Sequence, residues 1–184
     1  MLENLTKHLL IAMPSLQNHN FSRTVALVCE HNNHGAMGIV INQPTSISVE
    51  ELIDQIDVDD DSKKISNRNP VFAGGPVHIN RGFILHDSDR EWESTHIIDN
   101  DLKLTTSEDI LLDICQGTGP KNSIVALGYA GWAAGQLEQE LADNAWLTVS
   151  YEAKIVFTTP IEKRWQTAGG KLGIDLHLIS SDAG

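Results

Sequence analysis

The sequence predicts an α+β protein with a mixed, largely antiparallel sheet and a few flanking helices. Short apolar runs bounded by tight turns recur along the chain, and they follow one another rather than alternating strictly with helices. The 184 residues, 41% of them hydrophobic, are enough to bury a core without metals or disulfides. We expect one domain over residues 1–184. Two lobes sharing a core are the alternative, the smaller contributed by about residues 45–105.

The first elements are expected to be strands. His8–Met13 is apolar and is followed by Pro14, which ends it. Val25–Cys29 is apolar on both faces, as is typical of a central strand. Gly35–Asn42 follows through a short Asn-Asn-His connection, so these two runs predict a hairpin.

A short helix and a charged loop are expected next. Ser48 and Glu51 have the spacing of a capping box, which predicts a helix to about Ile56. Asp57–Asn69 is charged and lacks periodicity, so it is expected to form a mobile surface loop. If the chain forms two lobes, their hinge is expected near this loop.

The rest of the chain predicts further strands and three helices. Thr106 to Asp109 has the sequence of an N-terminal cap for a helix ended by Gly117, and Thr159-Pro160 begins one to about Ala168. Ser123–Leu147 predicts an apolar strand, a glycine-spaced turn and a Glu/Gln-rich helix. The remaining strands are expected within Pro70–Pro76, Arg81–His86, His96–Asp99, Leu102–Leu104, Trp146–Tyr151, Lys154–Thr158 and Ile174–Ile179.

Charge and cysteine content bound the function. Thirteen Lys and Arg against 25 Asp and Glu give a formal net charge of −12, which disfavours direct binding to nucleic acid. No apolar run reaches the ~20 residues needed to span a bilayer, and the start of the chain lacks a signal peptide, so we expect a cytoplasmic protein without a membrane partner. The two cysteines lack zinc-site spacing and are expected to be reduced thiols.

Cys29, Glu30 and His31 are the candidate catalytic residues. Residues two apart on a strand share a face, so His31 could approach the Cys29 thiol and lower its pKa, which would create a nucleophile or a redox sensor. The competing interpretation, which we favour, is that Cys29 is a small buried hydrophobe.

No metal or cofactor is expected. His31, His34 and His86 could approach one another, but no zinc-binding pattern accompanies them. The turn at Gly128–Gly135 is not spaced as a nucleotide-binding loop, and acidic rather than basic residues follow it.

Two glycine-rich segments supply the candidate ligand or partner residues. Gly75, Arg81 and His86 could line one pocket, with the guanidinium placed to bind a carboxylate. The segment GYAGWAAGQ adds a second set, Tyr129, Trp132 and Gln136. The alternative is structural: a tight turn with one exposed Arg in the first segment, and in the second glycines that let the strand pack against its helix while Trp132 fills a hole.

Several long motifs together resemble the bacterial AlgH/YqgE family. They are HLLIAMP, CEH followed by GAMGIVIN, GGPV with RGFILH, TTSED, LGYAGWAAGQLEQE and TPIEKRW, in the same order from Leu9 to about Leu176. The resemblance implies a compact cytosolic α+β protein with a mixed sheet and a smaller subdomain, without an established activity and often labelled a transcriptional regulator.

The leading hypothesis is a non-enzymatic regulatory or binding protein that acts through an unknown protein or small-molecule partner. Its CEH/GAMG, GGPV/RGF and GYAGW segments each lie at a strand end, where loops carry function, and are expected to converge on one surface pocket or patch. The alternative is a cysteine-dependent enzyme or thiol redox sensor that uses Cys29.

Overall fold

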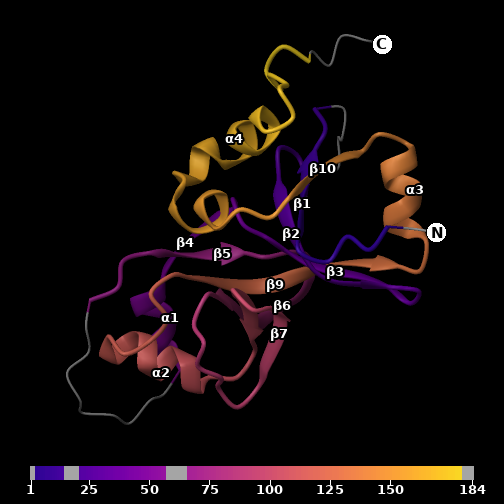
Figure 1. Cartoon of the computed structure of the whole chain (residues 1–184). Helices are drawn as coiled ribbons and strands as arrows, with labels where there is room; N and C mark the ends of the chain where they lie inside the picture. Colours follow the sequence, from indigo (N-terminus) through magenta and orange to yellow (C-terminus); the bar gives the residue numbers. More distant parts are fainter. Residues whose placement is uncertain (1–2, 15–20, 57–65, 180–184) are drawn as a thin grey trace.

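The computed structural model describes residues 3–14, 21–56 and 66–179, and these contain a ten-stranded sheet with helices around it (Figure 1). Every strand pair is antiparallel except β5 with β9, and the main order is β10-β1-β2-β3-β9-β6-β8-β7, with β4 and β5 attached beside it. The predicted α+β class is therefore confirmed. The strands are β1 (His8–Ala12), β2 (Val25–Asn32), β3 (Gly35–Val40), β4 (Pro44–Ser48), β5 (Pro70–Ala73), β6 (Val77–His86), β7 (Thr95–Asp99), β8 (Leu102–Thr105), β9 (Ser123–Ala133) and β10 (Trp146–Ser150).

Strand β9 joins the two halves of the sheet. Its second half pairs with β3, and its first half lies between β5 and β6. Figure 1 shows β5 along one edge of β9 and β6 along the other. The apolar run without charge from Ser123 onward has the composition that such a central position requires, because it is flanked by strands and packed on both faces.

The connection from β5 to β6 crosses β9. Phe72 of β5 and Phe83 of β6 both align with Ala126, so the two strands must occupy opposite edges of β9. The short crossing brings backbones into contact: a Cβ on Gly75 would lie 2.1 Å from the carbonyl carbon of Tyr129, and one on Gly128 would lie 2.4 Å from the Gly75 oxygen. Both have positive φ, +154° and +79°. The crossing therefore requires glycine in both segments.

Helices cover the sheet in three apolar clusters. The first lies between the sheet and the segment that includes α4 (Arg164–Gly170), and the second lies under α3 (Gln136–Ala142). The third lies among β4–β6, α1 (Val49–Gln55) and α2 (Asp109–Gln116). This third cluster draws on residues both inside and outside 45–105, and the smaller lobe stays a prediction.

The helix predicted from the capping box of Ser48 and Glu51 is α1. Glu51 N donates to Ser48 Oγ at 3.2 Å, and Ser48 N donates to a carboxylate oxygen of Glu51 at 2.8 Å, so the predicted capping box is confirmed. The loop predicted to follow begins with residues 57–65, which lie outside the described residues. No helix in the described part of the chain is long and apolar enough to cross a membrane.

The C-terminal region differs from the sequence prediction. Lys154–Thr158 forms a π-helical turn instead of a strand, with Ile155 and Val156 buried against the face of the sheet. Thr159 donates from both N and Oγ1 to the Lys154 carbonyl, so it ends that turn rather than capping the next helix. The strand predicted at Ile174–Ile179 does not form: residues 176–178 make a turn, and Leu176 packs against Gly169. The apolar side chains of both segments pack against the face of the sheet, and neither segment pairs with a strand at its edge.

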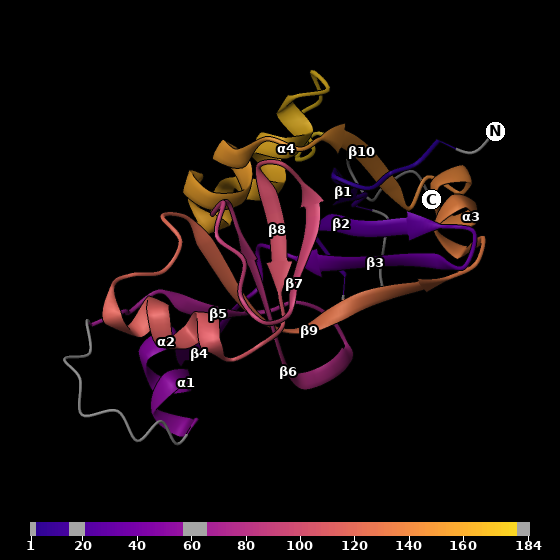
Figure 2. The same ribbon diagram turned by 60° about the horizontal axis from the view of Figure 1, so that its bottom comes forward.

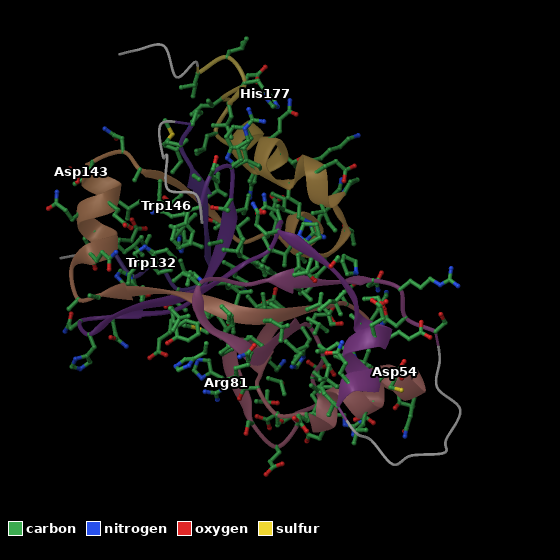
Figure 3. All side chains as sticks on the ribbon, turned by 180° about the vertical axis from the view of Figure 1, so that it is seen from behind. Asp54, Arg81, Trp132, Asp143, Trp146 and His177 are labelled. Carbon is green, nitrogen blue, oxygen red and sulfur yellow. The ribbon has the colours of Figure 1, made fainter. Side chains whose placement is uncertain are left out.

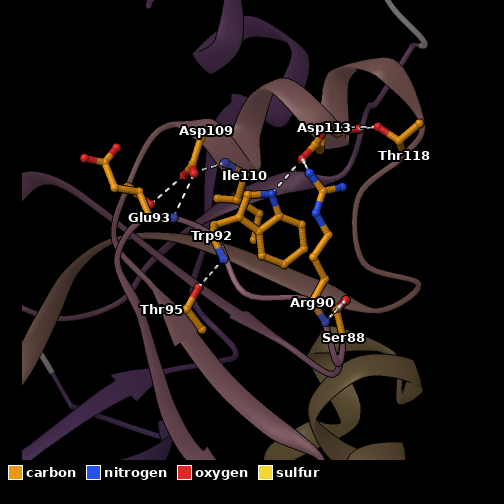
Figure 4. A network of polar contacts seen from close by, with 10 residues as sticks. Ser88, Arg90, Trp92, Glu93, Thr95, Asp109, Ile110, Asp113 and Thr118 are labelled. Carbon is orange, nitrogen blue, oxygen red and sulfur yellow. Dashed lines mark hydrogen bonds and ion pairs between the residues drawn. The ribbon is translucent and has the colours of Figure 1, made fainter.

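The loop between β6 and β7 is held on α2 by a polar network (Figure 4). Trp92 Nε1 donates to Asp113 Oδ2 at 2.7 Å, and Arg90 both ion-pairs with Asp113 at 2.8 Å and lies over the indole. Asp109 accepts from the backbone N of Glu93 at 2.8 Å. Since Asp109 is committed to this contact, α2 begins without the side-chain cap predicted at Thr106 to Asp109.

Candidate functional site

Cys29 and His31 lie on opposite faces of the sheet, so the catalytic pair that was the less favoured interpretation does not form, and the favoured one, Cys29 as a small buried hydrophobe, is confirmed. A β-bulge between Val28 and Glu30 inserts one residue and reverses the alternation of side chains. Cys29 keeps the face of Val25 and Leu27 in the first apolar cluster, where burial, with a smaller effect from Glu30, raises the pKa of its thiol to about 12. Glu30 points to solvent and accepts from Asn32 Nδ2.

His31 instead connects the N-terminal segment to α3. Its Nδ1 accepts from Leu5 N at 3.0 Å, so its Nε2 carries the proton and donates to Glu138 at 2.7 Å. The pKa of Glu138 is lowered by its own backbone N–H and by His31. His31 thus has a complete set of structural partners, and nothing in the structure supports the cysteine enzyme.

His86 does not join Arg81, and the expectation that the two share a pocket is wrong. His86 is fully buried, with Nε2 2.7 Å from Thr105 Oγ1 and its ring edge-on to Trp92 at 5.1 Å. Burial, with Lys103 as the second cause, lowers the pKa of the His86 imidazole to about 4. His86 lies four residues after Gly82 on β6 and pairs with Ser123 of β9, where β6 is buried in the core.

Trp132 and Gln136 hold α3 on the sheet. Glu140 Oε2 accepts from Trp132 Nε1 at 2.7 Å and from Trp146 Nε1 at 3.2 Å, while Gln136 accepts from Ala133 N at 3.0 Å. Figure 3 shows both indoles between the sheet and α3, with Arg81 beyond the β9 ribbon. This geometry agrees with the structural alternative, in which Trp132 fills a space between strand and helix.

One groove is lined by residues from three glycine-rich segments: CEH/GAMG is the first, GGPV/RGF the second and GYAGW the third. It has a volume of about 590 Å³ and opens where β3, β9 and the start of β6 meet. The CEH tripeptide itself lies outside it, and Gly75 lies beneath at the crossing. The lining residues are Ala36 and Met37 from the first segment, Val77, His78, Arg81 and Phe83 from the second, and Tyr129, Gly131 and Trp132 from the third.

Arg81 reaches the groove from a bulge in β6. Val77 aligns with Tyr129 and Gly82 aligns with Leu127, so five residues of β6 span the length of two of β9 and the intervening residues arch outward. His78 adopts a positive φ of 47° at the start of this arch. The arch leaves Arg81 exposed at the groove rather than paired within the sheet.

The groove combines aromatic rings with a cation. Tyr129 contacts Phe83 edge-on with centroids 5.4 Å apart, and Arg81 lies 5.5 Å over the Phe83 ring. Over residues 3–14, 21–56 and 66–179, no Asp or Glu forms an ion pair with Arg81, although the chain carries a net charge of −12. The site can therefore offer a free guanidinium beside an apolar surface to an anionic group.

Sequence reasoning found Arg81 and Tyr129 but missed several neighbours. Met37, Val77 and Phe83 lie within the quoted motifs, and the period-two alternation that puts Met37 and Gly131 opposite each other was available as a signal. His78 was not foreseeable, because the arch that exposes it follows from the register of β6 against β9. Within the described residues, no three His, Cys, Asp or Glu side chains are grouped to hold a metal ion.

These features define a mixed-sheet α+β protein with an open groove where the strands diverge. The chain belongs to the AlgH-like family, whose sequence profile matches residues 9–177. It is similar to a UPF0301 protein of Thioalkalivibrio sulfidiphilus, with 50% identity over 98% of this chain and 96% of the relative. A UPF0301 protein of Pseudoalteromonas translucida is 46% identical over 100% of this chain and 99% of the relative.

Two solved structures share the fold. The solution structure of AlgH from Pseudomonas aeruginosa superposes with a TM-score of 0.80 at 42% identity, covering 100% of this chain and 97% of that one. The crystal structure of DIP2367 from Corynebacterium diphtheriae gives a TM-score of 0.75 at 19% identity, covering 98% and 93%, which shows the fold alone.

Proposed function

We propose that this chain is a non-enzymatic binding protein that holds a regulatory partner, a protein or a small molecule, in the groove of β3, β6 and β9. The observation that carries the proposal is that the three glycine-rich segments, distant in sequence, line this one groove. The groove offers the exposed Arg81, and none of the residues that line it is Asp or Glu.

Chemical-shift mapping with small probes tests the proposal. We expect benzoate and N-acetyltyrosine to shift the amide signals of Gly131, Tyr129 and Arg81 in the 15N-labelled protein. Tyr129→Ala should weaken these shifts, whereas Lys121→Ala, which removes an exposed charge outside the groove lining, should leave them unchanged. Shifts confined to another surface, or insensitive to Tyr129→Ala, would contradict the groove.

Regulation is proposed to act through the bound partner, in the cytoplasm and without direct contact to DNA. The net charge of −12 repels phosphate, and direct binding would have to overcome that repulsion. We expect no retention of the protein on duplex DNA at low salt. Retention that falls steeply as salt rises would show direct binding instead.

A further inference from the structure

We propose that the partner in this groove is the C-terminal segment of another protein, which adds as a strand to the open edge of β9 and places its terminal carboxylate on Arg81. This inference rests on the proposed function and names the partner class. It depends on three observations made over the described residues: a strand edge without a neighbouring strand, a closed end of that edge, and a cation without an ion-pair partner at the closed end.

The edge is open over the last part of β9. Residues Ala130–Ala133 pair with β3 on one side only, and the pairing with β6 on the other side stops at Tyr129. In the described part of the chain no further strand covers that side, and Gly131 is exposed. Figure 2 shows the free lower edge of β9 beyond the start of β6. Such an edge is a template for a strand from another chain.

The open edge has room for a short peptide. Four residues at about 3.3 Å each give an edge of roughly 13 Å, enough to pair with four residues of an extended chain. A Cβ on Gly131 would meet only the Tyr129 and Val77 side chains, at 3.4 and 3.9 Å. Side chains of an added strand would therefore face the apolar floor made by Tyr129, Val77 and Phe83.

One end of this edge is closed, which favours a chain end over an internal segment. β6 takes up the same edge from Tyr129 onward and runs antiparallel to β9. A peptide added antiparallel along 130–133 would point its C-terminus at the start of β6. An internal segment would have to leave the sheet at that point, whereas a chain that ends there fits without a bend.

The closed end carries the charge that a terminal carboxylate needs. Arg81 and His78 stand on the arch of β6 beside it, and the residues that line the groove include no Asp or Glu. A guanidinium binds a carboxylate with two parallel hydrogen bonds, and capture of a C-terminal carboxylate is an established mode of peptide recognition. The remainder of this acidic chain repels acidic segments, so this groove is the complementary place for one.

Peptide libraries with matched ends test the inference. The probes are N-acetylated pentapeptides drawn from Val, Ile, Thr, Tyr and Phe, prepared with a free C-terminal carboxylate or as C-terminal amides, and the readout is amide shifts of the full chain. We expect the free acids to shift Gly131, Trp132 and Ala133 and to bind at least tenfold more tightly than the amides. N-methylation of the alternate residues whose N–H groups point at β9 should abolish binding, because it removes the ladder donors.

The matched variants are Arg81→Gln and Lys121→Gln, each of which removes one exposed positive charge. Arg81→Gln should reduce affinity for the free acids to that for the amides, and Lys121→Gln should leave both unchanged. Equal binding of the free acids and the amides overturns the terminal carboxylate, as does tighter binding of further amide peptides in which one internal residue is replaced by Asp or Glu.

Two further outcomes also overturn the inference. One is a failure of all peptides to shift the groove while benzoate and N-acetyltyrosine do so, which leaves the proposed binding function standing. The other is a concentration-dependent dimer in sedimentation that buries Gly131 and excludes the peptides, which would make a second copy of this chain the occupant of the edge.

Discussion

At the scale of single residues, one inserted residue in β2 prevents Cys29 and His31 from forming a catalytic pair. The bulge at Cys29 leaves its thiol in the first apolar cluster and turns His31 toward α3 on the other face. Two side chains that a regular strand would align are thereby separated by the sheet itself. Burial, with a smaller effect from Glu30, consequently governs the reactivity of the thiol, because the imidazole that could activate it faces the other side.

We expect the folded protein to protect Cys29 from iodoacetamide at pH 8, whereas both cysteines react rapidly once it is unfolded in guanidinium. Burial raises the pKa of the thiol from 9.0 to about 12, so the stability that it contributes is complete below pH 9 and is lost as the pH rises toward 12. Mass-spectrometric labelling measures both states. Rapid modification of Cys29 without unfolding would restore the redox alternative.

At the scale of elements, α3 depends on one carboxylate shared by two indoles. We expect Glu140→Ala to lower the free energy of unfolding by about 1–3 kcal/mol, because two partly buried indole N–H groups lose their acceptor. Glu140→Gln, which keeps one acceptor oxygen, should cost less. Urea unfolding followed by tryptophan fluorescence measures the change, and Gln139→Ala on the exposed side of α3 is the control. Equal losses for Ala at both positions would contradict this role.

The stabilisation that the Asp109 carboxylate gives to the start of α2 should be lost at acid pH. Burial raises the pKa of Asp109, but hydrogen bonds from Ser107 and from the backbone N–H groups of Glu93 and Ile110 outweigh it, so the pKa lies below the ordinary 3.8. The resulting stabilisation is complete above that value and is lost as the pH falls through the lowered pKa. We expect Asp109→Asn to be less stable than the native chain at pH 7 and to approach it below pH 4.

Thermal unfolding from pH 7 to pH 3 measures this convergence. The control is Asp89→Asn, since Asp89 is fully exposed in the same loop and lies 3.9 Å from its nearest cation. A stability difference between Asp109→Asn and the native chain that stays constant over this range would show that the contribution of Asp109 is independent of its charge.

At the scale of the whole molecule, two glycines allow the sheet to be continuous. We expect Gly75→Ala to prevent folding or to cost more than about 4 kcal/mol, because its Cβ would overlap the Tyr129 backbone. Gly170→Ala is the matched control, since its Cβ would meet nothing within 4 Å in an exposed helical position. Circular dichroism and urea unfolding compare the two, and an equally stable Gly75→Ala variant would disprove the close crossing.

The sequence was sufficient for two features that local interactions decide. The capping box at Ser48 and Glu51 and the hairpin at Asn32 and Gly35 are complete within a few residues, and both are confirmed. Tertiary contacts decided the rest. Lys154–Thr158 is apolar enough for a strand, but Ile155 and Val156 are buried against the face of the sheet, so the segment forms a helical turn instead of pairing at an edge.

The candidate site likewise contains residues that local sequence identifies and residues that only tertiary contacts place. Arg81 and Tyr129 were identifiable because they lie in glycine-rich segments at strand ends, and the structure places both at the groove. His86 was misplaced because its distance from Arg81 along β6 reverses its environment from surface to core. The bulge at Cys29 and the arch at His78 depend on register between strands, which a single sequence does not specify.

The crossing of β9 by the β5–β6 connection also constrains the order of folding. β9 lies between two strands that precede it by about 40 to 55 residues, so neither can complete its pairing until the ribosome has released most of the chain. These contacts are far apart in sequence, and the entropy of closing such loops slows folding. A chain cut short before Ser123 would leave β5 and β6 with facing, unfilled edges. The step that joins the two halves of the molecule is therefore a late one, and it must pass through the narrow gap that Gly75 and Gly128 keep open.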